Sequence, residues 1–348
     1  MFLTIINSLP GAIALGLVWG VMAVGLFITY KILDFADLTV DGSLCTGAVV
    51  CAMLVNGGTN IWLAMLCALL AGMSAGLVTG LLNTFFGIPP VMSGILTQLM
   101  LWSVNLKITV GKSNVSVNAR NIHVIITQLK IAEAIGIMFA VTAVVIFLLY
   151  WFFGTERGCS IRATGCNKEM SKAQGINTDV NKIIALMISN GLVALSGALL
   201  CQYQGFADIN MGRGAIVIGL AAVIIGEAVT MGLGCVFKGT ALLGTEIYGL
   251  FGARKDKEKF ALTKKKAVSG GALLGKNFAV KLFGVFLGSI VYYIVYQTVV
   301  CLGFDTDLLK LLSAVVVVIF LAIPYWKSKN IFLRRKKNKN GGNGECSK

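Results

Sequence analysis

Long apolar segments recur along almost the whole chain, and they limit what it can fold into. A helix needs about 20 apolar residues to cross the hydrocarbon core of a bilayer. Candidate spans lie near residues 11–30, 36–57, 60–84, 89–107, 131–153, 183–202, 214–252, 277–302 and 308–326. The chain is 57% hydrophobic and 13% charged, whereas soluble domains carry roughly 25% charged residues. We therefore predict an all-α, polytopic transmembrane helix bundle of about 8–10 spans.

Charge placement supports this class and orients the spans. The net charge is +15, and 22 of the 30 Lys and Arg residues fall in the stretches 153–182, 253–282 and 327–348. This is the positive-inside pattern of a multi-pass plasma-membrane protein, and basic runs beside spans favour anionic lipids over nucleic acid. We expect a transmembrane domain over 1–326 with cytoplasmic loops at 156–182 and 253–276. A basic cytoplasmic tail would follow at 327–348, and the N-terminus would be an uncleaved span with its start outside.

The segment 214–252 does not fit a simple span. It is too long for one helix and too short for three, and it contains several glycines together with Glu227, Lys238 and Glu246. Irregular backbone is tolerated at membrane depth only where protein or water covers it. We expect one broken or re-entrant helix here.

Signatures of catalysis and of metal binding are missing from the sequence. Nine cysteines contain no CxxC pair, and His123 is the only histidine. No phosphate-binding loop, HExxH or GxSxG motif occurs. We expect no enzyme activity, no cofactor and no metal site, so any ATPase that drives this protein must be another polypeptide.

The stretch from Glu156 to Lys182 is long for a loop between two spans. Residues 167–174 favour a short helix, for which Asn167 is a plausible N-cap and Gly175 a plausible C-terminal stop. Such a helix outside the membrane would suit docking of a cytoplasmic partner. An ordinary connecting loop is an equally good interpretation of the residues.

Polar residues at or near membrane depth are the candidates for a transport pathway. Ionisable groups there usually face a cavity or a partner. Asp37 and Asp41 fit that description, although both can also lie at the interface with Lys31 as counter-charge. Thr97 and Asn190 either line a pathway or bond a neighbouring helix. Gly72, Gly76 and Gly80 are spaced by four residues and so lie on one helix face, where we expect close helix packing. Asn83, which follows them, is a further pathway candidate.

Several segments, in this order, resemble the permease family of ribose-type sugar and branched-chain amino acid ABC importers. They are DLTVDGS (37–43), GLVTGLLNTFFGIPP (76–90), the pattern over 158–197, GLAAVIIGE (219–227) and GLGCVFKGTALLG (232–244). The resemblance covers roughly 31–252. It is closest to a subgroup linked with lipoprotein binding components and proposed aromatic amino acid substrates. Two departures from the family pattern are Asp41, inserted in the first motif, and Glu227, where glycine is common.

The resemblance implies a permease, homodimeric or heterodimeric, that works with cytoplasmic ABC ATPase subunits and an extracytoplasmic binding protein. It also implies that the 156–182 loop holds the helix that presses on the ATPase. The expected coupling residues are Arg162, Gly165, Asn167, Met170, Ala173 and Gly175. The possible pathway residues are Asp37, Asp41, Asn83, Thr97, Asn190 and Glu227.

The function expected from the resemblance is import of a small solute, an amino acid first, by ATP-driven alternating access. Import of a sugar or nucleoside is the nearest alternative. A secondary transporter driven by protons or sodium is the other, because Asp37, Asp41 and a broken late helix can supply a midplane ion site.

Overall fold

The computed structural model of the chain describes residues 2–117, 131–230 and 278–301, with the single positions 315 and 318. In this part of the chain, six helices are long and apolar enough to cross a membrane. The helices are α1 (Phe2–Phe27), α2 (Val40–Asn56), α3 (Ile61–Thr84), α4 (Pro90–Ile108), α5 (Ile131–Gly154), α6 (Glu156–Cys166), α7 (Lys168–Ala173), α8 (Thr178–Gln204) and α11 (Phe278–Cys301). A π-helical turn, η1 (Ile28–Ile32), continues α1, and a shorter apolar helix spans Ala215–Thr230.

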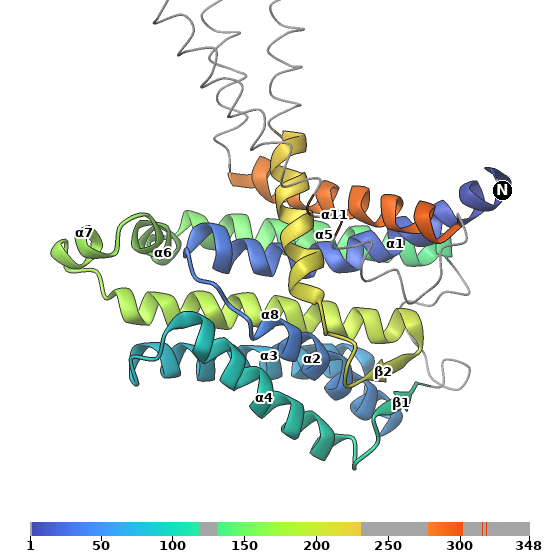
Figure 1. Cartoon of the computed structure of the whole chain (residues 1–348), viewed down its shortest axis with the longest axis horizontal. Helices are drawn as coiled ribbons and strands as arrows, with labels where there is room; N and C mark the ends of the chain where they lie inside the picture. The colour runs from blue at the N-terminus through green and yellow to red at the C-terminus, as the bar shows by residue number, and fades with distance from the viewer. Residues whose placement is uncertain (1, 118–130, 231–277, 302–314, 316–317, 319–348) are drawn as a thin grey trace, which may run out of the picture.

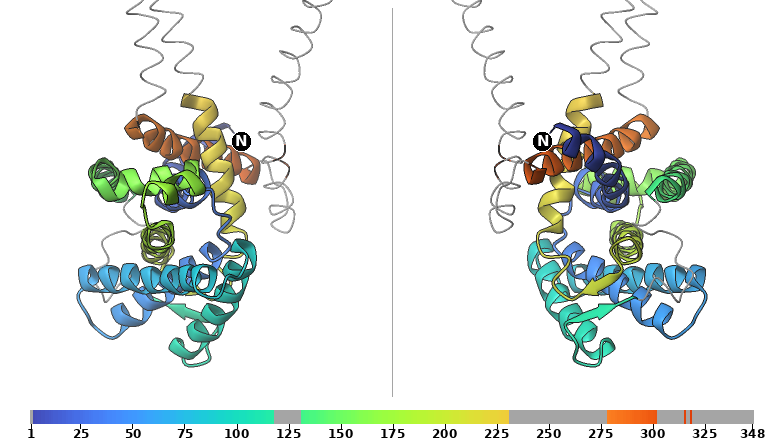
Figure 2. Two further views of the ribbon diagram at one scale, coloured as in Figure 1. Left: turned by 90° about the vertical axis from the view of Figure 1, so that its left-hand side faces the viewer. Right: turned by 90° about the vertical axis from the view of Figure 1, so that its right-hand side faces the viewer.

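Helix α8 is the centre of the bundle. It lies between a layer of α1, α5 and α11 and a layer of α2, α3 and α4 (Figure 1, Figure 2). Its most extensive contacts are with α3, α2 and α1. The Ala215–Thr230 helix, yellow in Figure 1, crosses α1 and α11 at a steep angle. These layers place α8 in the interior of the bundle, whereas α3 keeps an exposed apolar face that includes Trp62 and Leu66.

The two ends of the bundle differ. Helices α6 and α7 lie at one end, and the antiparallel pair β1 (Asn114–Ser116) and β2 (Phe206–Asp208) lies at the other (Figure 1). Helices α1 and α5 end, and α8 and α11 begin, at the end that carries α6 and α7. The orientation expected from the basic stretches, in which the end with α6 and α7 is cytoplasmic, stays a prediction.

The predicted span 36–57 begins later than expected. Residues 34–38 have no regular structure, and α2 starts only at Val40. This linker runs inward from the end of α1, so that α2 begins inside the bundle (Figure 1). The linker is more polar than the helix that follows it, since it contains Asp34 and Asp37, and the predicted span wrongly included its last three residues.

The glycine face predicted on α3 is confirmed. A Cβ atom at Gly72 would meet the Asn190 carbonyl, and one at Gly76 would meet the Leu186 carbonyl, both on α8. On α2, a Cβ atom at Gly47 would meet the Ala194 carbonyl. Lipid supplies no hydrophobic drive between helices, so close backbone approach of this kind supplies much of the attraction.

The 156–182 region contains more helix than expected. The predicted short helix is present as α7, but α6 precedes it and α8 begins at Thr178 rather than near 183. The side chain of Thr155 accepts a hydrogen bond from the Gly158 N–H and so caps α6. Ile161 and Thr164 then face inward and are buried, so packing stabilises a helix that composition alone does not favour.

Several predictions fall outside the described residues. These are the basic loop 253–276, the last span 308–326, the tail 327–348 and the latter part of 214–252. In the described part of 214–252, residues Ala215–Thr230 are helical up to the last described position.

Replacing Gly76 by valine should destabilise the bundle, because the new side chain would strike the α8 backbone. Overpacking of a tight core costs about 1–3 kcal/mol. Gly136→Val on α5 is the matched control, since a Cβ atom there meets nothing within 4 Å. Thermal unfolding of the detergent-purified protein measures the difference. Equal melting temperatures for the two variants would contradict the packing described here.

Candidate functional site

A network of buried polar side chains joins the linker to three helices. Asn190 on α8 donates from Nδ2 to Asp37 Oδ2 at 2.7 Å. Ser43 on α2 donates from its hydroxyl to Asn190 Oδ1 at 2.6 Å. Both Asn190 and Ser43 are fully buried, and Asp37 is only 6% exposed. Two of the predicted pathway residues, Asp37 and Asn190, are therefore in direct contact although 153 residues separate them.

Two further hydrogen bonds extend this network to Thr39, which precedes α2, and to Thr79 on α3. Asp37 Oδ1 accepts the Thr39 N–H at 2.9 Å, which satisfies a backbone donor just before the start of α2. The Thr39 hydroxyl hydrogen-bonds the Thr79 hydroxyl of α3 at 2.8 Å. A buried polar group without a partner is costly, so this set of bonds is what allows a carboxylate to sit inside an apolar bundle.

Asp41 lies apart from that network and has a different role. Its Oδ2 accepts the Gly214 N–H at 3.1 Å, and its Oδ1 accepts the Ile216 N–H at 3.0 Å. These donors open the Ala215–Thr230 helix. A carboxylate at this position caps the helix and interacts favourably with its dipole. The residue that departs from the family motif thus fixes the start of the crossing helix.

The expected coupling residues form one compact element at the end of the bundle. The side chain of Asn167 accepts the Met170 N–H at 3.0 Å, and Gly175 has φ +79°, so the predicted cap and stop of α7 are confirmed. Met170 is 60% exposed, and Ala173 is exposed beside it. This end of α7 therefore presents an uncovered apolar surface in the described part of the chain.

Strong contacts attach this element to the rest of the bundle. Arg162 donates to the Phe153 carbonyl of α5 at 2.8 Å and lies 5.9 Å from the Phe278 ring of α11. Gly165 packs so closely on η1 that a Cβ atom would strike the Ile32 carbonyl. Arg162 and Gly165 therefore anchor the element rather than form its outer surface.

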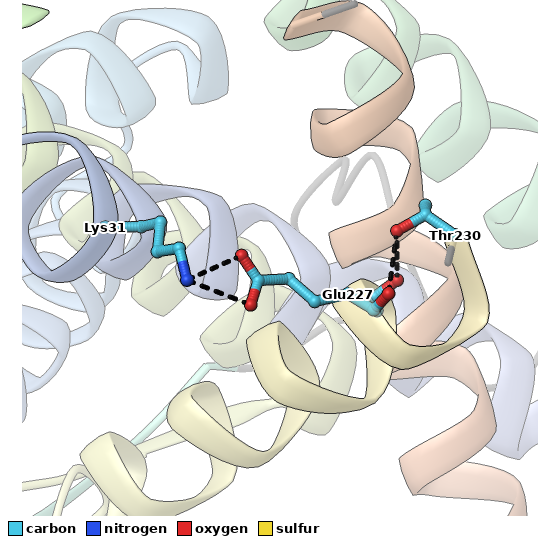
Figure 3. Close-up of polar contacts among 4 residues, drawn as sticks. Lys31, Glu227 and Thr230 are labelled. Carbon is cyan, nitrogen blue, oxygen red and sulfur yellow. Dashed lines mark hydrogen bonds and ion pairs between the residues drawn. The ribbon is translucent and has the colours of Figure 1, made fainter. Parts of the chain in front are cut away.

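Glu227 pairs with a residue near the end of α1. Its carboxylate lies 3.0 and 3.1 Å from Lys31 Nζ, as Figure 3 shows. The same figure shows Thr230, one turn later, bonded to the helix backbone. The pair joins η1 to the crossing helix. Lys31 is thus the counter-charge of Glu227 and makes no salt bridge with Asp37 or Asp41 among the described residues.

Asn83 and Thr97 serve local structure. Asn83 donates to the Ile88 carbonyl at 2.8 Å and closes the turn between α3 and α4. Thr97 donates to the Ser93 carbonyl of its own helix at 2.9 Å and is buried. Their part in a pathway stays a prediction.

Sequence reasoning missed Thr39, Ser43 and Thr79, which complete the buried network. Hydroxyl residues are common in membrane helices, and nothing in their local pattern separates these three from others. Among the described residues, no three His, Cys, Asp or Glu side chains gather where they could hold a metal ion.

Comparison with known proteins identifies relatives over most of the chain. The family described as branched-chain amino acid transport system / permease component matches residues 9–321. A tyrosine transport system permease protein of Clostridioides difficile (strain R20291) is 37% identical over 308 residues, 88% of each chain.

Two further likenesses are more distant. An autoinducer 2 import system permease protein of Yersinia pestis (strain Pestoides F) is 28% identical over 216 residues, 62% of this chain and 59% of the relative. The solved structure of PsaBC from Streptococcus pneumoniae in complex with Fab has a TM-score of 0.38 and 14% identity, and the match covers 85% of this chain and 95% of that one.

Asn190→Ala should destabilise the protein far more than Asn83→Ala. The first leaves the Asp37 carboxylate buried without its amide partner, a loss we expect to exceed about 2 kcal/mol. The second removes one bond at a partly exposed turn, worth about 1 kcal/mol. Thermal unfolding in detergent compares the two. In a double-mutant cycle, Asp37→Ala and Asn190→Ala should be strongly non-additive, and additivity would argue against the network.

Proposed function

The chain belongs to the branched-chain amino acid transport system permease family, and on this premise we propose that it imports an aromatic amino acid. It is a multi-pass membrane subunit of an ABC transporter complex, in which a separate subunit hydrolyses ATP and a binding component supplies the solute. Family membership sets aside the ion-coupled alternative, because the energy source lies on the ATPase.

The observation that carries the substrate proposal is the match to the tyrosine transport permease. It extends over 88% of both chains, so it includes the helices around the buried network as well as α6 and α7. The autoinducer 2 permease, a relative with a different cargo, matches over a smaller share of both chains and at lower identity. An amino acid is therefore favoured over a sugar or nucleoside.

We propose that two copies of the chain form the pathway and that α7 receives the force from the ATPase. Its exposed Met170 and Ala173 suit a cleft on a partner, while Arg162 and Gly165 fix α6 to α5, α11 and η1. The side chain of Asn181 on α8 adds a bond of 3.2 Å to Thr164 on α6.

This anchoring gives a route for mechanical coupling. Displacement of α7 moves α6, and α6 is attached to η1 and to α8. Those two elements carry the linker and Asn190, which meet at the Asp37 hydrogen bond. ATP-dependent closure at one end of the bundle thereby changes the position of the irregular backbone in its interior, as alternating access requires.

Transport tests the substrate. The full transporter, with its ATPase and its extracytoplasmic binding lipoprotein, is reconstituted in proteoliposomes and supplied with radiolabelled tyrosine. We expect ATP-dependent accumulation that excess phenylalanine suppresses and excess ribose leaves unchanged. Accumulation of ribose or a nucleoside, with no uptake of any aromatic amino acid, would refute the substrate proposal.

A charge placed on α7 tests the coupling. Met170→Glu should reduce uptake to the level seen without ATP, because a carboxylate would be buried unpaired against the ATPase. The control Val110→Glu makes the same kind of change at the opposite end, where Val110 is 79% exposed. Replacing Gly165–Gly175 with a flexible linker should leave ATP hydrolysis without uptake. Normal uptake in Met170→Glu and in the linker variant would disprove the docking role.

A further inference from the structure

A cavity lies between α2, α4 and the turn after β2. It is lined by polar and charged side chains that take no part in the coupling through α7 or in the Asp37 network. It measures about 150 Å³. Its lining residues are Asp41, Gly42, Cys45, Gln98, Leu99, Trp102, Asn105, Ile209 and Arg213. We propose that this cavity binds the charged α-amino and α-carboxylate groups of the amino acid in transit. The inference rests on the proposed function and assigns it a site within this chain.

The two charges in the cavity have opposite sign and are not paired with each other. Asp41 and Arg213 both line the space, and no salt bridge joins them or links Arg213 to any other described residue. Opposite charges that stand apart across a cavity are complementary to a zwitterion. The Arg213 guanidinium can hold a carboxylate in two parallel hydrogen bonds.

Asp41 keeps the capacity to bind an ammonium group. Its two oxygens each accept one backbone N–H, from Gly214 and from Ile216. A carboxylate offers about four acceptor positions, so roughly half remain for a ligand. The backbone bonds also fix the carboxylate at the cavity wall, which keeps it in place for the next molecule of substrate.

Asn105 supplies the second, independent sign of a ligand. Its side-chain oxygen has no hydrogen-bond partner, although the residue is only 1% exposed. Buried polar atoms are nearly always bonded, and an exception needs an explanation. An ammonium group offers three donors, enough to bond both this oxygen and Asp41.

The size of the cavity limits which part of the ligand it encloses. Pockets that hold a whole drug-sized ligand measure about 300–1,000 Å³, so this one suits the charged head of an amino acid. Trp102 lines the same cavity and is 46% exposed. Its partly exposed ring offers a stacking partner to an aromatic side chain that remains outside.

The location suits a solute that enters from outside. The lining residues of α4 start at its middle, at Gln98, and continue towards the end that leads to β1, and Ile209 follows β2 directly. Both strands lie at the end opposite α6 and α7 (Figure 1). The cavity is therefore reached before the Asp37 network, from the side on which a binding component would release its cargo.

Direct binding tests the site. The full-length chain in lipid nanodiscs is titrated by equilibrium dialysis with labelled tyrosine, with tyramine, which lacks the carboxylate, and with N-acetyltyrosine, which lacks the ammonium group. We expect tyrosine to bind best. Arg213→Gln should weaken tyrosine about tenfold, as for loss of one charge-assisted pair, and leave tyramine unchanged. Lys107→Gln removes the same charge from α4 outside the cavity and should behave as wild type.

A second variant and a second assay separate the outcomes. Trp102→Leu should weaken tyrosine but not alanine, whose side chain does not reach the ring. Uptake by the reconstituted transporter is measured for the same variants. If wild type transports tyrosine but Arg213→Gln matches Lys107→Gln in both assays, the site is wrong and the function stands. If wild type transports no amino acid, both proposals fail.

Discussion

Residues 34–38 are non-helical backbone inside an apolar bundle, where the Phe35 N–H bonds the Thr29 carbonyl and the Asp37 side chain joins the linker to the neighbouring helices. Asp37 accepts the backbone N–H that follows the linker and the side-chain amide of Asn190. Without those bonds, α2 could not begin inside the bundle, because the cost of unsatisfied groups in a membrane is high. The positions of α2, α3 and α8 relative to the linker all depend on this junction.

The sequence was informative where the signal is local. The cap at Asn167, the stop at Gly175 and the glycine face on α3 were all predictable, because each depends on residues within a few positions along one helix. Hydropathy likewise located most of the spans. Helix α6 was missed, since its stability comes from Thr155 and from burial of one face rather than from its composition.

Long-range pairings could not be predicted in the same way. Asp37 with Asn190, and Lys31 with Glu227, join residues separated by 153 and 196 positions. Sequence placed Lys31 near the aspartates, whereas the fold brings it to the crossing helix. Asp41 was the least predictable, because its partners are backbone N–H groups that carry no residue-specific signal. The fold, rather than the local sequence, decides whether a polar residue lines a cavity or only caps a helix.

The glycine contacts around α8 have a consequence for how such a transporter can change over evolutionary time. Where backbones touch at Gly47, Gly72 and Gly76, any side chain would separate the helices, so these positions tolerate almost no variation. Residues facing the cavity between α2 and α4 lie on the other side of α2 from those contacts. With cargo bound in this cavity, as proposed, its preference can drift through a few exchanges there while the scaffold stays constant.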